Sequence, residues 1–362
     1  MRVKRWAAVS AVTLTMGIAA GACGGTTDNA VVRDSNGGSV SAQGVAKLVH
    51  APGAVYAVTQ NDLFEARSSK FTKVGALPAS GDVALAFPGS GQAYLASLSG
   101  QSVRVFQSSN DGASWSASPG INGQTPPDGF THLSLAATAS RLFIVADEVT
   151  SSNFSSAAGF VRATTGARWT SVQLPTGGSV TALGDMLWLV GGPANDRLYA
   201  SSDGVSWQSA TPPGLPPQAT LANPVATGDG TILPVTVMGS TGQLRYYLTR
   251  DGGATWTQVA STPVSQGTEA GVSIPESVSA DTWIVISPDG SKIYKGTFSS
   301  NTSQTVISPN GLPGGVVQTE WSDSNDGVAL VVNSACPQGK DSCRSMSAVF
   351  STTDGGQTWN QE

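Results

Sequence analysis

Five segments of this chain share one pattern, a glycine three residues before a tryptophan. They read SSNDGASW, RATTGARW, ASSDGVSW, TRDGGATW and TTDGGQTW, and they end at Trp115, Trp169, Trp207, Trp256 and Trp359. An Asp or Asn side chain ahead of the glycine can bond backbone N–H groups two residues on, and glycine takes a positive φ without steric cost. The pattern therefore predicts a hairpin bend, repeated along the chain, after which the tryptophan starts a new strand.

The residues expected to form these bends lie at nearly fixed distances from each tryptophan. An aromatic residue also stands eight or nine positions before each tryptophan, which predicts a strand ahead of each bend. The predicted bend residues are Asn110, Asp111, Gly112 and Trp115; Gly166 and Trp169; Asp203, Gly204 and Trp207; Asp251, Gly253 and Trp256; and Asp354, Gly356 and Trp359. Because forming the turn accounts for the acidic members, we interpret them as structural and predict no catalytic residue among them.

These segments resemble the Asp-box, or bacterial neuraminidase repeat, with the consensus S-x-D-x-G-x-T-W. The copies that start at Thr249 and Thr352 match closely, whereas the copy that starts at Arg162 is degenerate. The resemblance implies a sialidase-like β-propeller in which each repeat joins the third and fourth strands of a blade, away from the substrate site. The chain is not a close match to the catalytic sialidases.

The intervals between the tryptophans indicate the number of blades. They are 54, 38, 49 and 103 residues, so the last interval holds two blades. One more blade precedes the first repeat, with Phe71 in the place of the tryptophan. We predict an all-β fold, a single β-propeller of about seven four-stranded blades of about 49 residues each. Six blades remain the alternative if the first blade is incomplete.

The start of the chain predicts export. Basic residues precede an apolar stretch from Trp6 to Ala20, which is too short to span a bilayer as a mature helix. Small residues then precede Cys23, as in a bacterial lipobox, although Ala20 replaces the usual leucine. We predict a lipoprotein signal peptide over 1–22, a flexible tether over 23–43 that starts at a lipidated Cys23, and the propeller over 44–362. An ordinary secretory signal is the alternative.

A lipid anchor of this kind would hold the protein at the cell membrane, on the extracytoplasmic side. Export would also place Cys336 and Cys343 in an oxidising compartment, where we predict a disulfide that staples a long hairpin loop. A redox-active pair is the alternative, although nothing in the surrounding sequence indicates a lowered thiol pKa.

Composition and motifs exclude several kinds of ligand. The net charge is −5 and lysines and arginines are not clustered, which argues against nucleic acid. The two histidines, His50 and His132, fall on predicted first strands without a cluster of other ligands, so we predict no metal site. No phosphate-binding or dinucleotide motif occurs, and we expect no cofactor. The arginines that a sialidase needs for its substrate carboxylate fall on predicted third strands or inside the bends.

We therefore predict a surface-anchored, monomeric, non-enzymatic propeller that binds an extracytoplasmic protein or glycan through one face. Propellers of similar build, such as the photosystem II assembly factors and sortilin-type receptors, act as binding scaffolds. The alternative is a secreted glycoside hydrolase, sialidase-like or otherwise active on polysaccharide, which requires two facing carboxylates. The acids expected on the ligand face are Asp128, Glu148, Glu269, Glu276 and Glu320.

Overall fold

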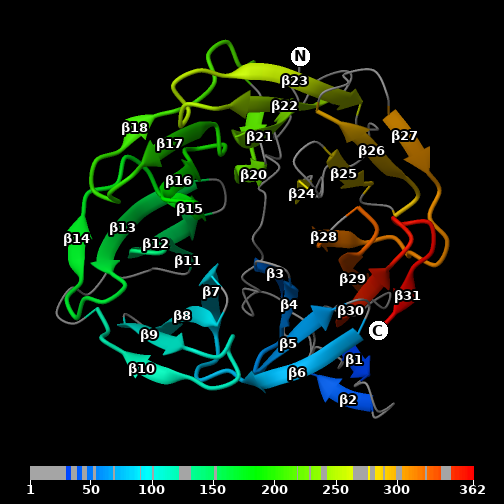
Figure 1. Ribbon diagram of the computed structural model, residues 1–362, viewed down its shortest axis with the longest axis horizontal. Coiled ribbons are helices and arrows are strands. Elements are labelled where there is room, and N and C mark those ends of the chain that lie inside the picture. Colours follow the sequence, from blue (N-terminus) through cyan, green and yellow to red (C-terminus); the bar gives the residue numbers. More distant parts are fainter. Residues whose placement is uncertain are drawn as a thin grey trace, which may run out of the picture.

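The computed structural model describes residues 30–33, 39–42, 47–51, 54–67, 70–89, 91–99, 102–121, 132–150, 153–217, 219–227, 230–237, 243–263, 276–277, 282–287, 290–298, 304–322, 324–335 and 344–362. In these residues every regular element is a strand, and none forms a helix able to cross a membrane. The strands build one β-propeller of seven antiparallel blades around a common centre (Figure 1). The all-β prediction is thus confirmed, with seven blades rather than six.

Each blade is a continuous piece of chain that runs from the centre of the ring outward. The first four blades are β3 (Lys47–Ala51), β4 (Ala54–Val58), β5 (Asp62–Arg67) and β6 (Lys70–Ala76); β7 (Asp82–Gly89), β8 (Gln92–Ser99), β9 (Ser102–Ser108) and β10 (Ser116–Ser118); β11 (His132–Ala137), β12 (Arg141–Thr150), β13 (Asn153–Ala163) and β14 (Thr170–Val172); and β15 (Gly178–Leu183), β16 (Met186–Gly191), β17 (Arg197–Ser201) and β18 (Gln208–Ser209).

The remaining three blades follow the same order, except that the inner strand of the fifth blade is split in two. They are β19 (Ala219–Leu221) with β20 (Val225–Thr227), β21 (Gly230–Val237), β22 (Gln243–Thr249) and β23 (Thr257–Pro263); β24 (Glu276–Ser277), β25 (Thr282–Ile286), β26 (Ile293–Thr297) and β27 (Gln304–Ile307); and β28 (Val316–Trp321), β29 (Gly327–Ala335), β30 (Arg344–Thr352) and β31 (Asn360–Gln361). Outside the ring, β1 (Ala30–Arg33) and β2 (Ser39–Ala42) pair as a hairpin, and β1 contacts β30.

Apolar packing between neighbouring blades holds the ring together. Among the described residues, the buried apolar side chains form seven clusters, one at each joint between consecutive blades. The cluster that closes the ring joins Leu48, Phe64 and Phe71 of the first blade to Val328 and Leu330 of the last. Full burial of a side chain of this size contributes about 1.5–3 kcal/mol, so each joint stabilises the ring substantially.

The five tryptophan segments form the bends between the third and fourth strands of their blades. In the bend after β22, the hydroxyl of Thr249 accepts from Gly253 N at 2.9 Å and donates to Asp251 at 2.8 Å. Asp251 in turn accepts from the backbone N–H of Thr255 at 2.9 Å. Gly253 has φ +93°, and a Cβ there would approach the Cβ of Ala210 to 2.7 Å, so only glycine fits.

The same pairing of a hydroxyl with an Asp or Asn two residues later recurs in three other bends. The pairs are Ser108 with Asn110, Ser201 with Asp203, and Thr352 with Asp354. Bonds from the backbone N–H groups of Ser206 and Val205 lower the pKa of Asp203 to about 2. A carboxylate that accepts several N–H bonds is stabilised in its charged form, which is the role expected of a turn-forming acid.

The second bend is built differently, because Arg162 stands where Ser108, Thr249 and Thr352 stand in theirs. Its side chain is 2% exposed, and its guanidinium lies 5.0 Å from the centre of the Trp169 ring. A cation–π contact thus takes the place of the hydroxyl pairing in this copy.

The tryptophans of the bends pack at the joint between their own blade and the preceding one. Trp169 Nε1 donates to the carbonyl of Pro119 at 2.7 Å, and Trp256 Nε1 donates to that of Ala210 at 2.7 Å. In both cases the acceptor directly follows the outermost strand of the preceding blade. In the first blade, Phe71 is 2% exposed and lies in the cluster that closes the ring, in the role that a tryptophan has elsewhere.

Two predictions, the tether and the disulfide, concern segments of which the structure describes only a part. The hairpin β1–β2 lies within the segment 23–43 that we expect to be a tether. Ala335 pairs with Arg344, and the segment between them, which includes Cys336 and Cys343, lies outside the described residues. The signal peptide and Cys23 also lie outside them.

The hydrogen-bonded bends can be tested by replacing Thr249 with Val. The substitution keeps the shape of the side chain but removes the acceptor of Gly253 N–H, which is buried in the bend. We expect a loss of about 1–3 kcal/mol in the free energy of unfolding, measured by urea denaturation followed by tryptophan fluorescence. Thr249→Ser keeps the hydroxyl and should lose much less. Equal stability of Thr249→Val and the wild type would contradict this account.

Candidate functional site

The order of strands gives the propeller two different faces. Because each blade is an antiparallel meander, its inner strand begins at the face where the hairpin between its second and third strands lies. We call this the front face; the tryptophan bends lie on the opposite face, the corner face. The longest hairpins, β12–β13 and β29–β30, both turn at the front face.

Three charged or titratable side chains stand at the front end of three successive inner strands. Lys47 is the first residue of β3, Asp82 the first of β7 and His132 the first of β11. In each strand the next residue, Leu48, Val83 or Leu133, is apolar and buried in a joint between blades. We call Lys47, Asp82, His132 and Asp147, the partner of His132, the mouth site.

Two of these side chains, Lys47 and Asp82, bond the backbone of the inner strand in the next blade. Lys47 Nζ donates to the carbonyl of Val83. Asp82 accepts from the backbone N–H of Leu133. An inner strand has no neighbour on its channel side, so its N–H and C=O groups there need other partners. The mouth site supplies such partners to the second and third blades.

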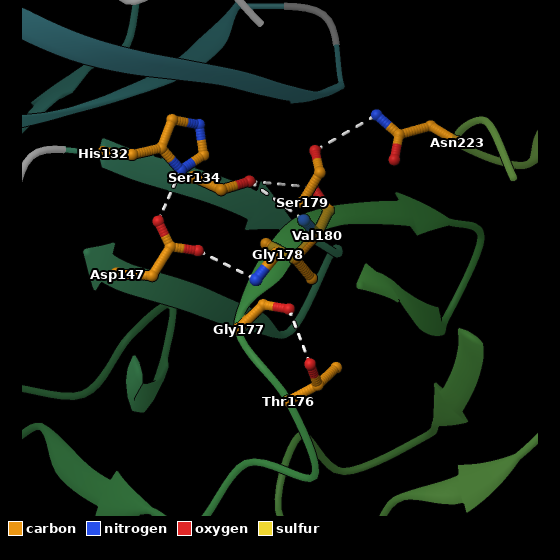
Figure 2. Close-up of polar contacts among 9 residues, drawn as sticks. All are labelled: His132, Ser134, Asp147, Thr176, Gly177, Gly178, Ser179, Val180 and Asn223. Carbon is orange, nitrogen blue, oxygen red and sulfur yellow. Dashed lines mark hydrogen bonds and ion pairs between the residues drawn. The ribbon is translucent and has the colours of Figure 1, made fainter. Parts of the chain in front are cut away.

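His132 and Asp147 extend the same arrangement to the fourth blade (Figure 2). They lie opposite each other in the register of β11 and β12, and His132 Nδ1 is 2.8 Å from Asp147 Oδ1. Asp147 Oδ2 accepts from Gly178 N at 2.8 Å, and the Asp147 side chain is fully buried. Gly178 has φ +142°, and a Cβ there would come within 2.0 Å of Val190 O, so the close approach requires glycine.

Two uncharged side chains cap inner strands in the same way. Ser134 Oγ accepts from Val180 N at 2.9 Å and donates to Val180 O at 3.3 Å, as Figure 2 shows. At the joint that closes the ring, the amide of Gln318 donates to Leu48 O at 2.8 Å and accepts from Leu48 N at 2.9 Å. The side-chain amide therefore bonds Leu48 as one residue of a paired antiparallel strand would.

The charges of the mouth site shift one another's ionisation. Burial alone lowers the pKa of His132, but the hydrogen bond to Asp147 and the charges of Asp147 and Asp82 outweigh it, so the pKa lies above 6.5. Burial raises the pKa of Asp82, against the influence of Lys47 and His132. Because the pKa of His132 is raised by folding, its protonated form adds stability below about pH 6.5, and this contribution is lost as the pH rises through the folded value.

The mouth site also contains hydrogen-bonding capacity that the fold does not use. Asp82 Oδ2 is buried and makes no hydrogen bond. Since Nδ1 of His132 faces Asp147, its Nε2 is the remaining polar atom of the ring, and it donates only when the ring is protonated. Lys47 has three N–H donors and needs one for Val83. The site thus presents one free acceptor beside cationic donors.

Of the five acids predicted for the ligand face, Glu320 is the one whose side-chain contacts the structure describes. Asp128 and Glu269 lie outside the described residues. Glu148 is on β12 and Glu276 begins β24, and both belong to front-face segments by their position in the strands. Glu320 lies on β28, where Gln318 donates to it at 3.0 Å and His50 Nδ1 is 3.8 Å away.

The structure also places the residues considered for a sialidase or a metal site. Arg67, Arg104, Arg162, Arg197 and Arg245 all lie on third strands. A sialidase-type cluster of arginines at the channel is therefore not formed by these five. Among the described residues, no group of three or more His, Cys, Asp or Glu side chains is placed to hold a metal ion.

Sequence reasoning placed His132 on an inner strand but did not identify the mouth site. Lys47, Asp82 and His132 are far apart in the sequence, and only the packing of consecutive blades brings their strands side by side. A usable signal does exist: each precedes a short apolar run, LVHA, VALA or LSLAA, at the start of a blade.

The pairing of His132 with Asp147 can be tested by titration. In Asp147→Asn the carboxylate that raises the pKa of His132 is removed, while burial continues to lower it. We expect the imidazole pKa to fall below its wild-type value, measured by NMR. The chain has two histidines, so His50→Gln leaves the signal of His132 alone. An unchanged pKa in Asp147→Asn would show that the contact does not form.

Comparison with known proteins supports the fold. Neither a protein-family model nor a curated protein sequence matches this chain. Among solved structures, Kluyveromyces lactis Hsv2 is similar with a TM-score of 0.54 and 7% identity, over 88% of this chain and 98% of that one. YCF48 bound to D1 peptide is similar with a TM-score of 0.50 and 16% identity, over 79% of this chain and 83% of that one. At such identities the likeness shows that all three chains share the β-propeller fold.

Proposed function

We propose that this protein is a surface-anchored binding propeller that recognises a segment of polypeptide on its front face. The proposal rests on the hydrogen bonds of the mouth site. Its side chains are fixed by bonds to the inner strands, yet Asp82 Oδ2 remains a buried acceptor without a partner. A rigid set of hydrogen-bonding groups at the rim of a channel is suited to recognition, because little conformational freedom is lost on binding.

The same contacts disfavour hydrolysis of glycosides. A glycoside hydrolase needs one carboxylate as acid and a second as base or nucleophile. Asp147 has both oxygens engaged, one by His132 and one by Gly178 N, so it is not free to attack or to activate water. Glu320 is held by Gln318 through a hydrogen bond of 3.0 Å. We therefore favour binding over the hydrolase alternative.

The choice of a polypeptide over a glycan draws on the solved structure of YCF48, which is described as bound to D1 peptide. That likeness concerns the fold, and we carry over only the class of ligand as part of this proposal. The long hairpins β12–β13 and β29–β30 turn at the front face and enlarge the surface available there.

The anchor forms part of the proposal. A lipid on Cys23 would hold the propeller at the extracytoplasmic side of the cell membrane, with the segment up to residue 43 as the connection. We expect the wild-type protein in the membrane fraction and Cys23→Ser in the soluble fraction after cell fractionation and immunoblotting. Unchanged membrane association of Cys23→Ser would contradict lipidation.

Binding can be tested with a phage-displayed library of random peptides and, in parallel, a glycan array, both probed with the full-length protein. We expect selected peptides to bind, and a single arginine on the front face to weaken binding. Ala194→Arg places a large side chain in the exposed β16–β17 turn of that face, and Val205→Arg does so at the corner face. The proposal predicts weaker binding in the first variant only. Selection of glycans and no peptides would overturn it.

A further inference from the structure

The atoms of the mouth site that the fold leaves unpaired determine which hydrogen-bonding groups a ligand needs in order to bind there. Asp82 Oδ2 requires a donor, because a buried acceptor without a partner is costly. Lys47 and His132 lie close enough to Asp82 to shift its ionisation, and both present N–H groups when they are protonated. A ligand group that matches this site therefore carries a hydrogen-bond donor and an acceptor next to each other.

Charge balance indicates that this ligand group is neutral. Burial lowers the pKa of Lys47 and raises those of Asp82 and Asp147, so it opposes charge on these groups; when all four groups are ionised, two positive charges stand against two negative ones. A charged ligand would leave a net charge in a largely buried place, which costs free energy. A neutral polar group would satisfy the free atoms and keep the balance.

The positions of the acceptor and the donors narrow the choice of neutral ligand group further. The acceptor and the two donors come from the inner strands of three successive blades, which lie side by side around the centre of the ring. A trans peptide unit points its N–H and its C=O in opposite directions within one rigid plane, and one N–H of an Asn or Gln amide has the same orientation. Either group can therefore give its N–H to Asp82 while its oxygen accepts from Lys47 or His132.

We propose that the mouth site binds a carboxamide group of a polypeptide, either a backbone peptide unit or an Asn or Gln side chain, between Asp82 on one side and Lys47 and His132 on the other. This inference rests on the proposed function, since it names the group recognised within a polypeptide ligand. Asp147 acts as a positioning residue, because its bond to Nδ1 fixes which nitrogen of His132 faces the ligand.

The decisive variant is Asp82→Asn. Its amide oxygen can still accept from Leu133 N, whereas an NH₂ group replaces the free acceptor and meets the N–H of the ligand with another donor. With a peptide selected on the wild-type protein at pH 6, we expect Kd by fluorescence anisotropy to rise about tenfold. Asp185→Asn, an exposed change in a corner-face turn, should leave Kd unchanged.

The pH dependence gives a second, independent measurement. His132 loses its donor at Nε2 as the pH rises through its folded pKa, so peptide affinity should fall over that interval. His50→Gln should keep this dependence and His132→Gln should remove it. If Asp82→Asn lowers the melting temperature by several degrees, the pH profiles of these two histidine variants decide instead.

The outcomes separate this inference from the proposed function. Equal affinity of the wild type and a folded Asp82→Asn, for peptides that Ala194→Arg weakens, would overturn the carboxamide site and leave a peptide-binding propeller. A flat pH profile in the wild type would also overturn the carboxamide site. Absence of any selected peptide would overturn the proposed function, and this inference with it.

Discussion

The inner strand of every blade has a backbone edge that no other strand covers, and satisfying this edge is the constraint on which the centre of the molecule depends. Polar side chains do so at four of the joints, each from the preceding blade. Lys47, Asp82, Ser134 and Gln318 serve β7, β11, β15 and β3 in turn. Water would otherwise have to satisfy these groups, and the channel would be less firmly ordered.

This arrangement explains why polar residues gather at the centre of the propeller. A side chain that caps a strand edge is held in place by the fold, and its chemistry is partly consumed by that role. Asp147 is the clearest case, because the register of β11 and β12 sets it opposite His132 while its second oxygen reaches Gly178. The capacity that remains, at Asp82 Oδ2 above all, is the part of the centre on which the proposed binding site rests.

The fold could be predicted from the sequence to a large extent, because short sequence patterns indicate its bends and strands. The glycines and tryptophans of the bends gave the period, and Phe71 indicated the blade without a tryptophan. The mouth site could not be predicted in the same way. Lys47, Asp82 and His132 become neighbours only through the packing of three consecutive blades, and the partner of His132 depends on strand register rather than on spacing in the chain.

Every blade takes all of its strands from one uninterrupted stretch of chain, the last blade included. The ring is closed by the cluster that includes Phe71, Val328 and Leu330 and by the amide of Gln318, and among the described strands none from one end of the chain joins the sheet at the other end. Cutting the connection between any two blades and joining the present ends would therefore leave each sheet whole. Such circular permutants should retain the same seven sheets. Each blade is thus a complete unit of the chain, and the packing at its two joints determines which blades are its neighbours.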